Sequence, residues 1–305
     1  MLPTLRQLQY LKLLAQHGSF SRAAEAAHVT QPTLSAGVQE LEKILGAPVV
    51  DRARSGVILT PVGEEALRRG SEILAQAEDL LQAARSAGQP LTGRFRLGVI
   101  PTVAPFLLPK VLQAVRTRHP NLKLFLREDR TPGLIAALKA GALDAAIIAL
   151  PYDTAGLSTD RIGDDELLAA LPANHALVGS GPLKPGDLVN EDLILLEDGH
   201  CLREHALGAC GLPAPKSSPG DDVFAATSLA TLVQMVGAGL GVTFLPAMAI
   251  EAGLIDQIPI STRQLATDRA SREIVIAWRA GSSRGPESRL LAEVFRGTER
   301  SAATP

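Results

Sequence analysis

The stretch FSRAAEAAHVTQPTLSAGVQELE, residues 20–42, decides how the N-terminal part of the chain folds. Its first half can form a short helix capped by Ser19 or Ser21, with alanines small enough for close packing against a neighbour. Pro32 fits the first turn of a second helix, because a backbone N–H has no partner there. Leu34 and Val38 recur at helical spacing and predict the buried face of that second helix.

Two helices joined by a short turn, the second with a polar outer face, form a helix-turn-helix. In this motif the start of the second helix lies in the major groove of DNA, where Gln, Ser and Thr side chains hydrogen-bond to base edges. The candidate DNA-binding side chains of this segment are Arg22, Thr30, Gln31, Thr33, Ser35 and Gln39. The alternative is a small helical bundle with a solvated polar face, and the pattern alone leaves both interpretations open.

The segments on either side extend this motif. Leucines at helical spacing predict a further helix over residues 4–17, and residues 48–60 alternate like a short hairpin. Such a hairpin would form a wing on which Arg52 and Arg54 meet DNA phosphates. Positions 1–65 carry six basic and six acidic residues, a balance that is unusual because phosphate contacts supply much of the affinity for DNA.

A long helix is predicted from Thr60-Pro61 to about residue 86. Small and apolar residues step by four and three along it from Ala66 to Ala84, as in the seam of a coiled coil. We expect a dimerising linker, since DNA-reading helices need a partner to span two half-sites, and an ordinary packed helix is the alternative. The following GQPLTG, residues 88–93, has the composition of a hinge.

Beyond the hinge the pattern changes to alternating strands and helices, which predicts parallel sheets. The chain would leave one α/β lobe, build a second and return to the first, with a ligand cleft between them. The expected strands are 94–100, 122–128, 143–150, 167–171 and 274–278, and the expected helices are 102–118, 132–140 and about 287–295. The predicted domains are an all-α winged helix-turn-helix domain at 1–60, a linker helix at 61–88 and a two-lobed α/β regulatory domain at 92–301, with lobe I at about 92–163 and 269–301 and lobe II at about 164–268.

Both cysteines of the chain lie in one segment, EDGHCLREHALGAC, residues 197–210. A strand is expected just before it, so Cys201 would lie in the first turn of a helix, close to His200 and Arg203. A helix N-terminus and neighbouring cations favour the thiolate, the form that attacks peroxide. The first product would be a sulfenic acid, with which a second thiol can condense to give a disulfide.

The spacing of the two cysteines adds a conformational requirement. In one continuous helix, nine residue steps would separate the Cα atoms of Cys201 and Cys210 by ~13.5 Å. A disulfide needs Cα atoms within about 7 Å, so oxidation would have to melt the helix, which Gly208 and Gly211 would ease. The alternative is that both cysteines are small buried hydrophobic residues.

Thr102 and Thr131 each follow an expected strand at the start of an expected helix. Their hydroxyls would orient a small polar ligand such as peroxide, and simple helix capping is the alternative. No spacing of His and Cys fits a closed zinc site, and no phosphate loop or Ser-His-Asp order stands out. We therefore expect a protein without a bound metal, without a cofactor and without enzymatic activity.

The composition sets the compartment we expect. Hydrophobic residues make up 46% and charged residues 20% of the 305 residues, a balance typical of globular proteins. No apolar run reaches the roughly 18 residues of a membrane span, and the N-terminus lacks the pattern of a signal peptide. We expect a cytoplasmic protein without membrane contact, whose thiols are kept reduced.

The run from Phe20 to Ser35, Leu41-Glu42 and the LTPVG of residues 59–63 together resemble the LysR-type transcriptional regulators. The resemblance covers the whole chain and is specific. It implies a tetramer built from dimers and a regulatory domain like a periplasmic binding protein. The partners that it implies are double-stranded promoter DNA and RNA polymerase.

Within that family, residues 196–203 with Cys210 are similar to the peroxide-sensing members. That similarity implies Cys201 as the peroxidatic residue and Cys210 as the resolving one, with hydrogen peroxide as the signal and a cellular thiol reductant to reset the switch. It also implies that Thr102, Thr131, His200 and Arg272 surround bound peroxide. Two departures stand out: Gln39-Glu40 where relatives often have basic residues, and Ala225 where they can have arginine. The alternatives are a regulator answering an organic effector in the cleft and a thiol peroxidase.

Overall fold

The computed structural model describes residues 1–53, 56–85, 90–179, 181–211 and 225–302. The chain forms two compact units. The first comprises residues 1–88 and 136–142, and the second comprises residues 89–135 and 143–305.

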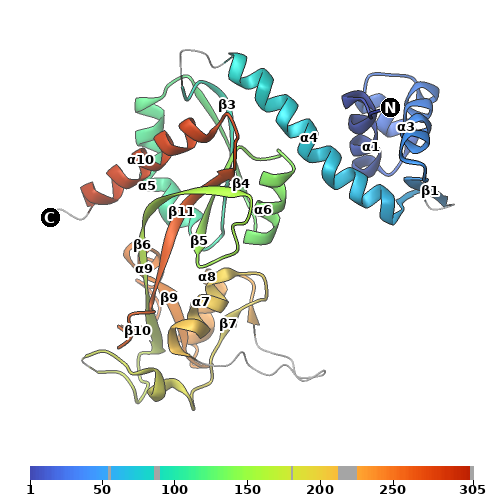
Figure 1. The fold of residues 1–305 in the computed structure, drawn as a ribbon. Coiled ribbons are helices and arrows are strands. Elements are labelled where there is room, and N and C mark those ends of the chain that lie inside the picture. Colours follow the sequence, from blue (N-terminus) through green and yellow to red (C-terminus); the bar gives the residue numbers. More distant parts are fainter. Residues whose placement is uncertain (54–55, 86–89, 180, 212–224, 303–305) are drawn as a thin grey trace. The chain divides into compact units, whose positions relative to one another are not determined.

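The first unit contains three short helices, a hairpin and a long helix (Figure 1). These are α1 (Leu5–His17), α2 (Phe20–Ala26), α3 (Gln31–Leu45), β1 (Val50–Ala53), β2 (Gly56–Leu59) and α4 (Pro61–Arg85). Leu11, Leu14, Leu34 and Leu41 are almost fully buried between the first three helices. The predicted winged helix-turn-helix is therefore confirmed, with antiparallel β1 and β2 as its wing.

The glycine of the LTPVG stretch, residues 59–63, is required sterically at the start of α4. The N–H of Gly63 donates to Thr60 Oγ1 at 3.0 Å, and this hydroxyl donates to Pro48 O at 2.7 Å. A Cβ at position 63 would lie 1.9 Å from Val49 O. Only glycine lets the first turn of α4 approach the wing this closely.

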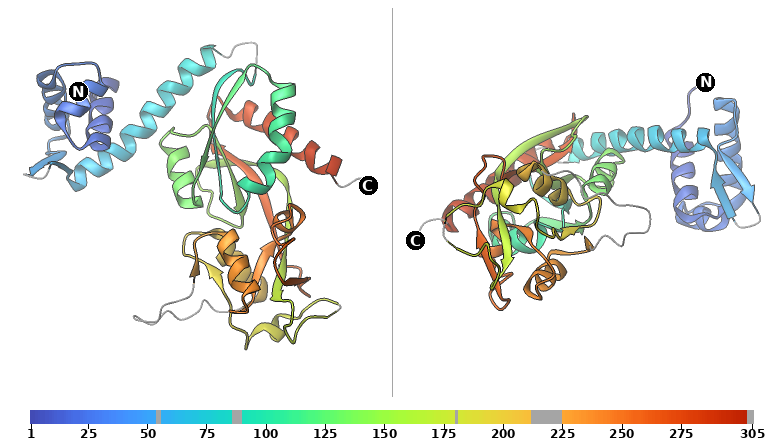
Figure 2. Two further views of the ribbon diagram at one scale, coloured as in Figure 1. Left: turned by 180° about the vertical axis from the view of Figure 1, so that it is seen from behind. Right: turned by 90° about the horizontal axis from the view of Figure 1, so that it is seen from below.

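The second unit is built on a seven-stranded sheet in the order β10-β6-β11-β5-β3-β4, with β9 also paired to β6. Its parallel part consists of β3 (Gly93–Val99), β4 (Leu122–Glu128) and β5 (Ala145–Leu150). The connections run through α5 (Ala104–Arg118) and α6 (Thr131–Lys139). Figure 2 shows α10 (Gly285–Ala302) lying beside α5, and the two helices are in contact.

The remaining strands correct the prediction of parallel sheets. β6 (Leu157–Pro172), β9 (Thr243–Pro246), β10 (Ile260–Arg263) and β11 (Ser271–Arg279) all pair antiparallel. β5 and β6 are not neighbours, because β11 returns between them and pairs antiparallel with both. Sequence reading found only the apolar end of β6, because its first half alternates with exposed charged residues.

Strand β6 belongs to both lobes of the second unit. Its residues 157–166 pair with β11, whereas residues 167–172 pair with β9 and β10. We call the β3, β4, β5 and β11 side the first lobe, and the β9 and β10 side the second lobe. The second lobe also holds η1 (Pro185–Leu188), β7 (Leu195–Leu196), α7 (Cys201–Cys210), β8 (Ala225–Ala226), α8 (Leu229–Gly237) and α9 (Ala247–Glu251).

Candidate functional site

Helix α7 begins at Cys201, directly after the loop that follows β7 (gold in Figure 1). The Cys201 side chain is a free thiol and is buried, with 4% of the residue exposed. His200 occupies the N-cap position but makes no side-chain capping bond. The helix runs to Cys210 without a break, so the predicted helix over residues 201–210 is confirmed. The side chain of Cys210 lies outside the described residues.

The guanidinium of Arg272 is fully buried at the junction of the two lobes. Arg272 and Asp165 are directly opposite each other on β11 and β6. Nε and Nη2 of Arg272 both donate to Asp165 Oδ2, at 2.9 and 2.8 Å. Asp165 Oδ1 in turn accepts from the N–H of Met248 at the start of α9, at 3.0 Å. The ion pair therefore joins both lobes, with neither side chain more than 1% exposed.

The other side of Arg272 is turned toward Thr102, in the loop between β3 and α5. Nη1 donates to Thr102 Oγ1 at 2.9 Å, and Nη2 donates to Thr102 O at 3.1 Å. Because Oγ1 already accepts from Arg272, the hydroxyl hydrogen of Thr102 is available to donate to a ligand. Thr102 is therefore not a helix cap but a hydroxyl oriented by a buried cation.

Thr131 is the first residue of α6, and only 1% of it is exposed. Its hydroxyl lies beside the Cys201 thiol and lowers the pKa of that thiol. Among the described residues Oγ1 has no nitrogen or oxygen partner. A buried hydroxyl without such a partner is uncommon, and here it faces the same space as Cys201.

The protonation of Cys201 differs from the prediction of a favoured thiolate. Burial raises the pKa of the Cys201 thiol, while Arg272 and the Thr131 hydroxyl lower it and Glu204 raises it further. Arg203 does not take part: it pairs with Asp198 at 3.0 Å and donates to Leu196 O at 3.2 Å. Burial and the charge of Arg130 lower the pKa of His200, so this ring favours its neutral form. The cation that favours the thiolate is therefore Arg272.

These residues pack closely around Cys201, and the space between them is too narrow for a water-sized molecule as the side chains stand. Its lining consists of Ile100, Pro101, Thr102, Arg130, Thr131, Gly199, His200 and Cys201. Pockets for organic ligands usually hold roughly 300–1,000 Å³, whereas a water molecule takes roughly 30 Å³. A molecule as small as hydrogen peroxide therefore needs a slight shift of side chains to reach Cys201, whereas an organic effector would need a much larger rearrangement.

Sequence reasoning missed Asp165 and Arg130. Asp165 lies in a charged stretch, Asp164-Asp165-Glu166, that looks solvated in sequence. Only the strand register, which sets Asp165 opposite Arg272, distinguishes it from its neighbours. Arg130 precedes Thr131, and its proximity to Thr131 was the one available signal.

Of the candidate DNA-reading residues, four lie at the start of α3 (Thr30, Gln31, Thr33 and Ser35), whereas Arg22 lies in α2 and Gln39 farther along α3. Arg22, Thr30, Gln31, Thr33 and Gln39 are exposed, and Ser35 is half-buried. Ser21 Oγ donates to Gln31 Oε1 at 3.3 Å, while Thr30 Oγ1 accepts from the N–H of Thr33 at 3.4 Å and caps α3. Arg52 is in β1 but its side chain lies outside the described residues, as does the whole of Arg54.

The described residues contain neither a candidate metal centre nor a membrane-spanning helix. No group of three or more His, Cys, Asp or Glu side chains in the described ranges is arranged to hold a metal ion. None of the described helices is long and apolar enough to span a bilayer.

Two family models match the chain. Residues 5–64 match the bacterial regulatory helix-turn-helix protein model of the lysR family, and residues 88–300 match the LysR substrate binding domain. The chain is 42% identical over 255 residues to the HTH-type transcriptional regulator EstR of Acinetobacter baylyi, covering 83% of each protein. It is 39% identical over 292 residues to a probable hydrogen peroxide-inducible genes activator of Mycobacterium avium, covering 95% of this chain and 92% of the relative.

Solved structures agree with these relatives. A full-length OxyR variant from Pseudomonas aeruginosa is 34% identical and superposes with a TM-score of 0.76, covering 97% of this chain and 98% of that one. A hydrogen peroxide-bound OxyR cysteine mutant from Corynebacterium glutamicum is 34% identical with a TM-score of 0.66, covering 99% and 94%. Both domains, their order and their fold match along the whole length, and the chain belongs to the LysR family of transcriptional regulators.

Proposed function

We propose that this regulator is switched by hydrogen peroxide, through oxidation of Cys201 and formation of a Cys201–Cys210 disulfide, and controls oxidative-stress genes. The observation that carries the proposal is the small enclosed pocket in which a buried thiol meets two threonine hydroxyls and a buried arginine. The peroxide-inducible relatives and the peroxide-bound structural neighbour support it.

The chemistry is a two-electron oxidation of sulfur. The Cys201 thiolate attacks one peroxide oxygen, the O–O bond breaks, and the other oxygen leaves as hydroxide and takes up a proton to become water. The Cys210 thiolate then attacks the Cys201 sulfenic acid, the S–S bond forms and a second water leaves. Two thiols and one peroxide thus give one disulfide and two waters, and a cellular thiol reductant returns the two electrons and two protons.

Four polar residues around Cys201 have roles in the first step. Arg272 stabilises the thiolate and fixes the Thr102 hydroxyl, whose hydrogen can bond to peroxide. The Thr131 hydroxyl is free to bond to the second peroxide oxygen or to the sulfur. His200 favours its neutral form, so it can accept or donate a hydrogen bond without adding a competing charge.

The second step requires α7 to unfold. Its ends are ~13.5 Å apart while the helix persists, about twice the separation of Cα atoms that a disulfide allows. Oxidation therefore replaces one local fold by another. Such a bistable element is what a switch needs.

The remaining roles follow from the family. The first unit would bind double-stranded promoter DNA through Arg22, Thr30, Gln31, Thr33, Ser35 and Gln39, with Arg52 and Arg54 of the wing on the phosphates. The exposed Ile73, Leu80 and Leu81 on α4 support its use in assembling a homotetramer, a dimer of dimers. We also propose RNA polymerase as a partner and the cytoplasm as the location of the protein. No catalytic turnover is proposed.

The test is peptide mass spectrometry, without reduction, after near-stoichiometric hydrogen peroxide. We expect a Cys201–Cys210 bridge in the wild-type protein and none in Cys201→Ser. In Cys210→Ser the first step should still occur, leaving a Cys201 sulfenic acid that a dimedone probe traps. A Cys201 that stays a free thiol in ample peroxide would overturn the proposal and favour regulation by an organic effector.

A further inference from the structure

The entrance to the pocket is confined to three of its eight lining residues. Ile100, Thr102, Thr131, His200 and Cys201 are all buried, with at most 6% exposed. Pro101, Arg130 and Gly199 are the half-exposed members of the lining. A molecule from solvent must therefore pass between these three residues to reach the thiol.

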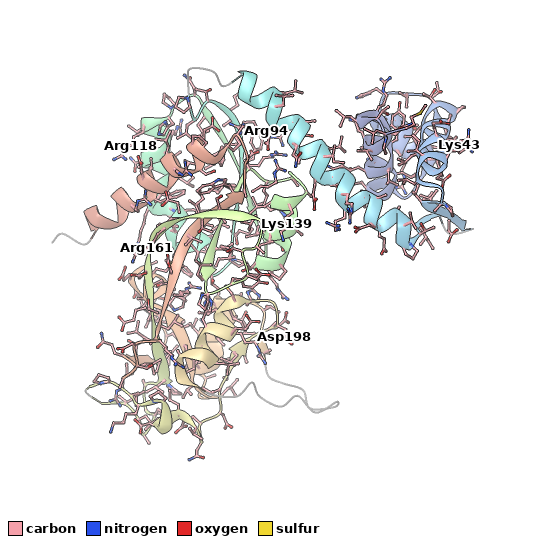
Figure 3. All side chains as sticks on the ribbon, in the orientation of Figure 1. Lys43, Arg94, Arg118, Lys139, Arg161 and Asp198 are labelled. Carbon is pink, nitrogen blue, oxygen red and sulfur yellow. The ribbon has the colours of Figure 1, made fainter. Side chains whose placement is uncertain are left out.

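Arg130 crosses this entrance from one lobe to the other. Its backbone belongs to the loop between β4 and α6, in the first lobe. Its Nη2 donates to Glu197 Oε2 and its Nη1 donates to Asp198 O, both at 2.7 Å, in the loop that precedes α7 in the second lobe. Figure 3 marks Asp198 on that loop.

The stem of the same side chain lies against Gly199. A Cβ added at Gly199 would be 3.2 Å from Arg130 Cδ, so the two residues are in close contact. The φ of Gly199 is +88°, a conformation that keeps this side of the loop open for the arginine. The two hydrogen bonds to residues 197 and 198 hold the stem in that place.

We infer that Arg130, held by Glu197 and Asp198, is a specificity-determining residue that restricts the Cys201 pocket to hydrogen peroxide and excludes bulky organic hydroperoxides. The inference rests on the proposed function, because it assumes that peroxide is the reactant. The Arg130–Glu197 pair is about 40% exposed, so it adds little to stability, and water can replace its bonds when a small molecule enters. A bulky hydroperoxide needs the whole side chain to leave.

The experiment compares rates of Cys201 oxidation by hydrogen peroxide and by cumene hydroperoxide in the full-length protein. Arg130→Ala should raise the cumene hydroperoxide rate by about tenfold or more relative to the hydrogen peroxide rate, the scale of discrimination by a snug pocket. Glu197→Ala should give the same shift more weakly. The control is Arg127→Ala, because Arg127 is an exposed neighbour paired with Asp129 and lies outside the pocket.

A purely structural role for Arg130 would change both rates together and leave their ratio unchanged, which would overturn the inference. Alkylation of Cys201 provides a second readout that does not depend on peroxide. Arg130→Ala should speed the reaction with bulky monobromobimane more than with small iodoacetamide. If neither peroxide oxidises Cys201 in the wild-type protein while alkylation shows this size effect, the proposed function is wrong but Arg130 still restricts access to Cys201. If alkylation shows no size effect either, Arg130 does not restrict access and the inference is wrong.

Discussion

Helices α3 and α7 carry the two candidate functions, and they are built in opposite ways. α3 has Thr30 as a side-chain N-cap, Pro32 in its first turn and Gly46 in the left-handed conformation at its C-cap. α7 also ends on a left-handed glycine, Gly211, but His200 gives it no side-chain N-cap. α3 has 15 residues and α7 has 10, and short helices are marginal without tertiary support.

The two helices also differ in what surrounds them. α3 buries one stripe, Leu34, Val38 and Leu41, and leaves its polar side exposed. α7 buries Leu202, Ala206, Leu207 and Ala209 against the second lobe, and Cys201 against Thr102 and Thr131 of the first. Its stability therefore comes from packing, which a change at Cys201 can disturb directly. α3, the candidate DNA-reading helix, is thus stabilised at its own ends, whereas α7, which is proposed to refold, is stabilised by its surroundings.

The largest expected effect comes from removing the cation beneath α7. Arg272→Met leaves Asp165 buried and unpaired, which should lower the free energy of unfolding of the second unit by about 3–5 kcal/mol. Hydrogen exchange should show the loss in α7 and β6 and not in α3. The double variant Arg272→Met with Asp165→Leu should recover much of it, and a single variant within about 1 kcal/mol of wild type would contradict the role of the pair.

A smaller effect should follow from removing the cap of α3. Thr30→Ala should destabilise the first unit by about 1 kcal/mol, because the N–H of Thr33 loses its acceptor. Thr30→Ser keeps that acceptor and serves as the control. Thermal unfolding followed by circular dichroism measures the change. Equal melting temperatures for the two variants would show that the Thr30 cap does not stabilise α3.

Strengthening α7 should slow its refolding without altering the thiol. Gly208 is exposed, and a Cβ there would meet no atom within 4 Å. Gly208→Ala should therefore stabilise the helix by about 1 kcal/mol and slow disulfide formation about fivefold. Quenched-flow trapping with dimedone should show an unchanged rate of sulfenic acid formation. A disulfide that forms as fast as in wild type would mean that α7 does not have to melt.

The smallest effect concerns pH. Burial and the charge of Arg272 lower the pKa of His205 in α7, against the raising effect of its bond to Pro151 O. As pH falls below the ordinary histidine pKa of about 6.5, His205 takes up a proton in the unfolded chain but not in the folded one. The free energy of unfolding therefore decreases as pH falls. Denaturant unfolding at about pH 7.5 and about pH 5.5 should show a smaller difference for His205→Gln than for wild type. His200, whose pKa is also lowered, should retain part of the slope.

The sequence predicted local features better than pairings. Helical spacing and capping residues located α1 to α4, because helices depend on neighbours three and four residues apart, whereas α7 was placed by the strand expected just before it. The resemblance to a known family placed Thr102, Thr131, His200 and Arg272 around Cys201, and the structure brings Thr102, Thr131 and His200 into one lining with Cys201, with Arg272 bonded to Thr102.

What could not be predicted depends on register. The antiparallel partners of β6, the Asp165–Arg272 pair and the bridge from Arg130 to Glu197 join residues far apart in sequence. The raised pKa of Cys201 differs from the predicted preference for the thiolate, because a helix N-terminus is visible in the sequence whereas the degree of burial is not.

Strand β6 sets a limit on how a signal can leave the pocket. Because its 16 residues pass unbroken from one lobe into the other, a clamshell closure around a ligand would have to bend β6 itself where its partners change, between residues 166 and 167. The register of the β6–β11 ladder shifts only at Ile274/Val275 of β11, toward the first lobe. If Cys201 is oxidised as proposed, we expect the signal to be a changed surface around α7 rather than an opening and closing of the lobes.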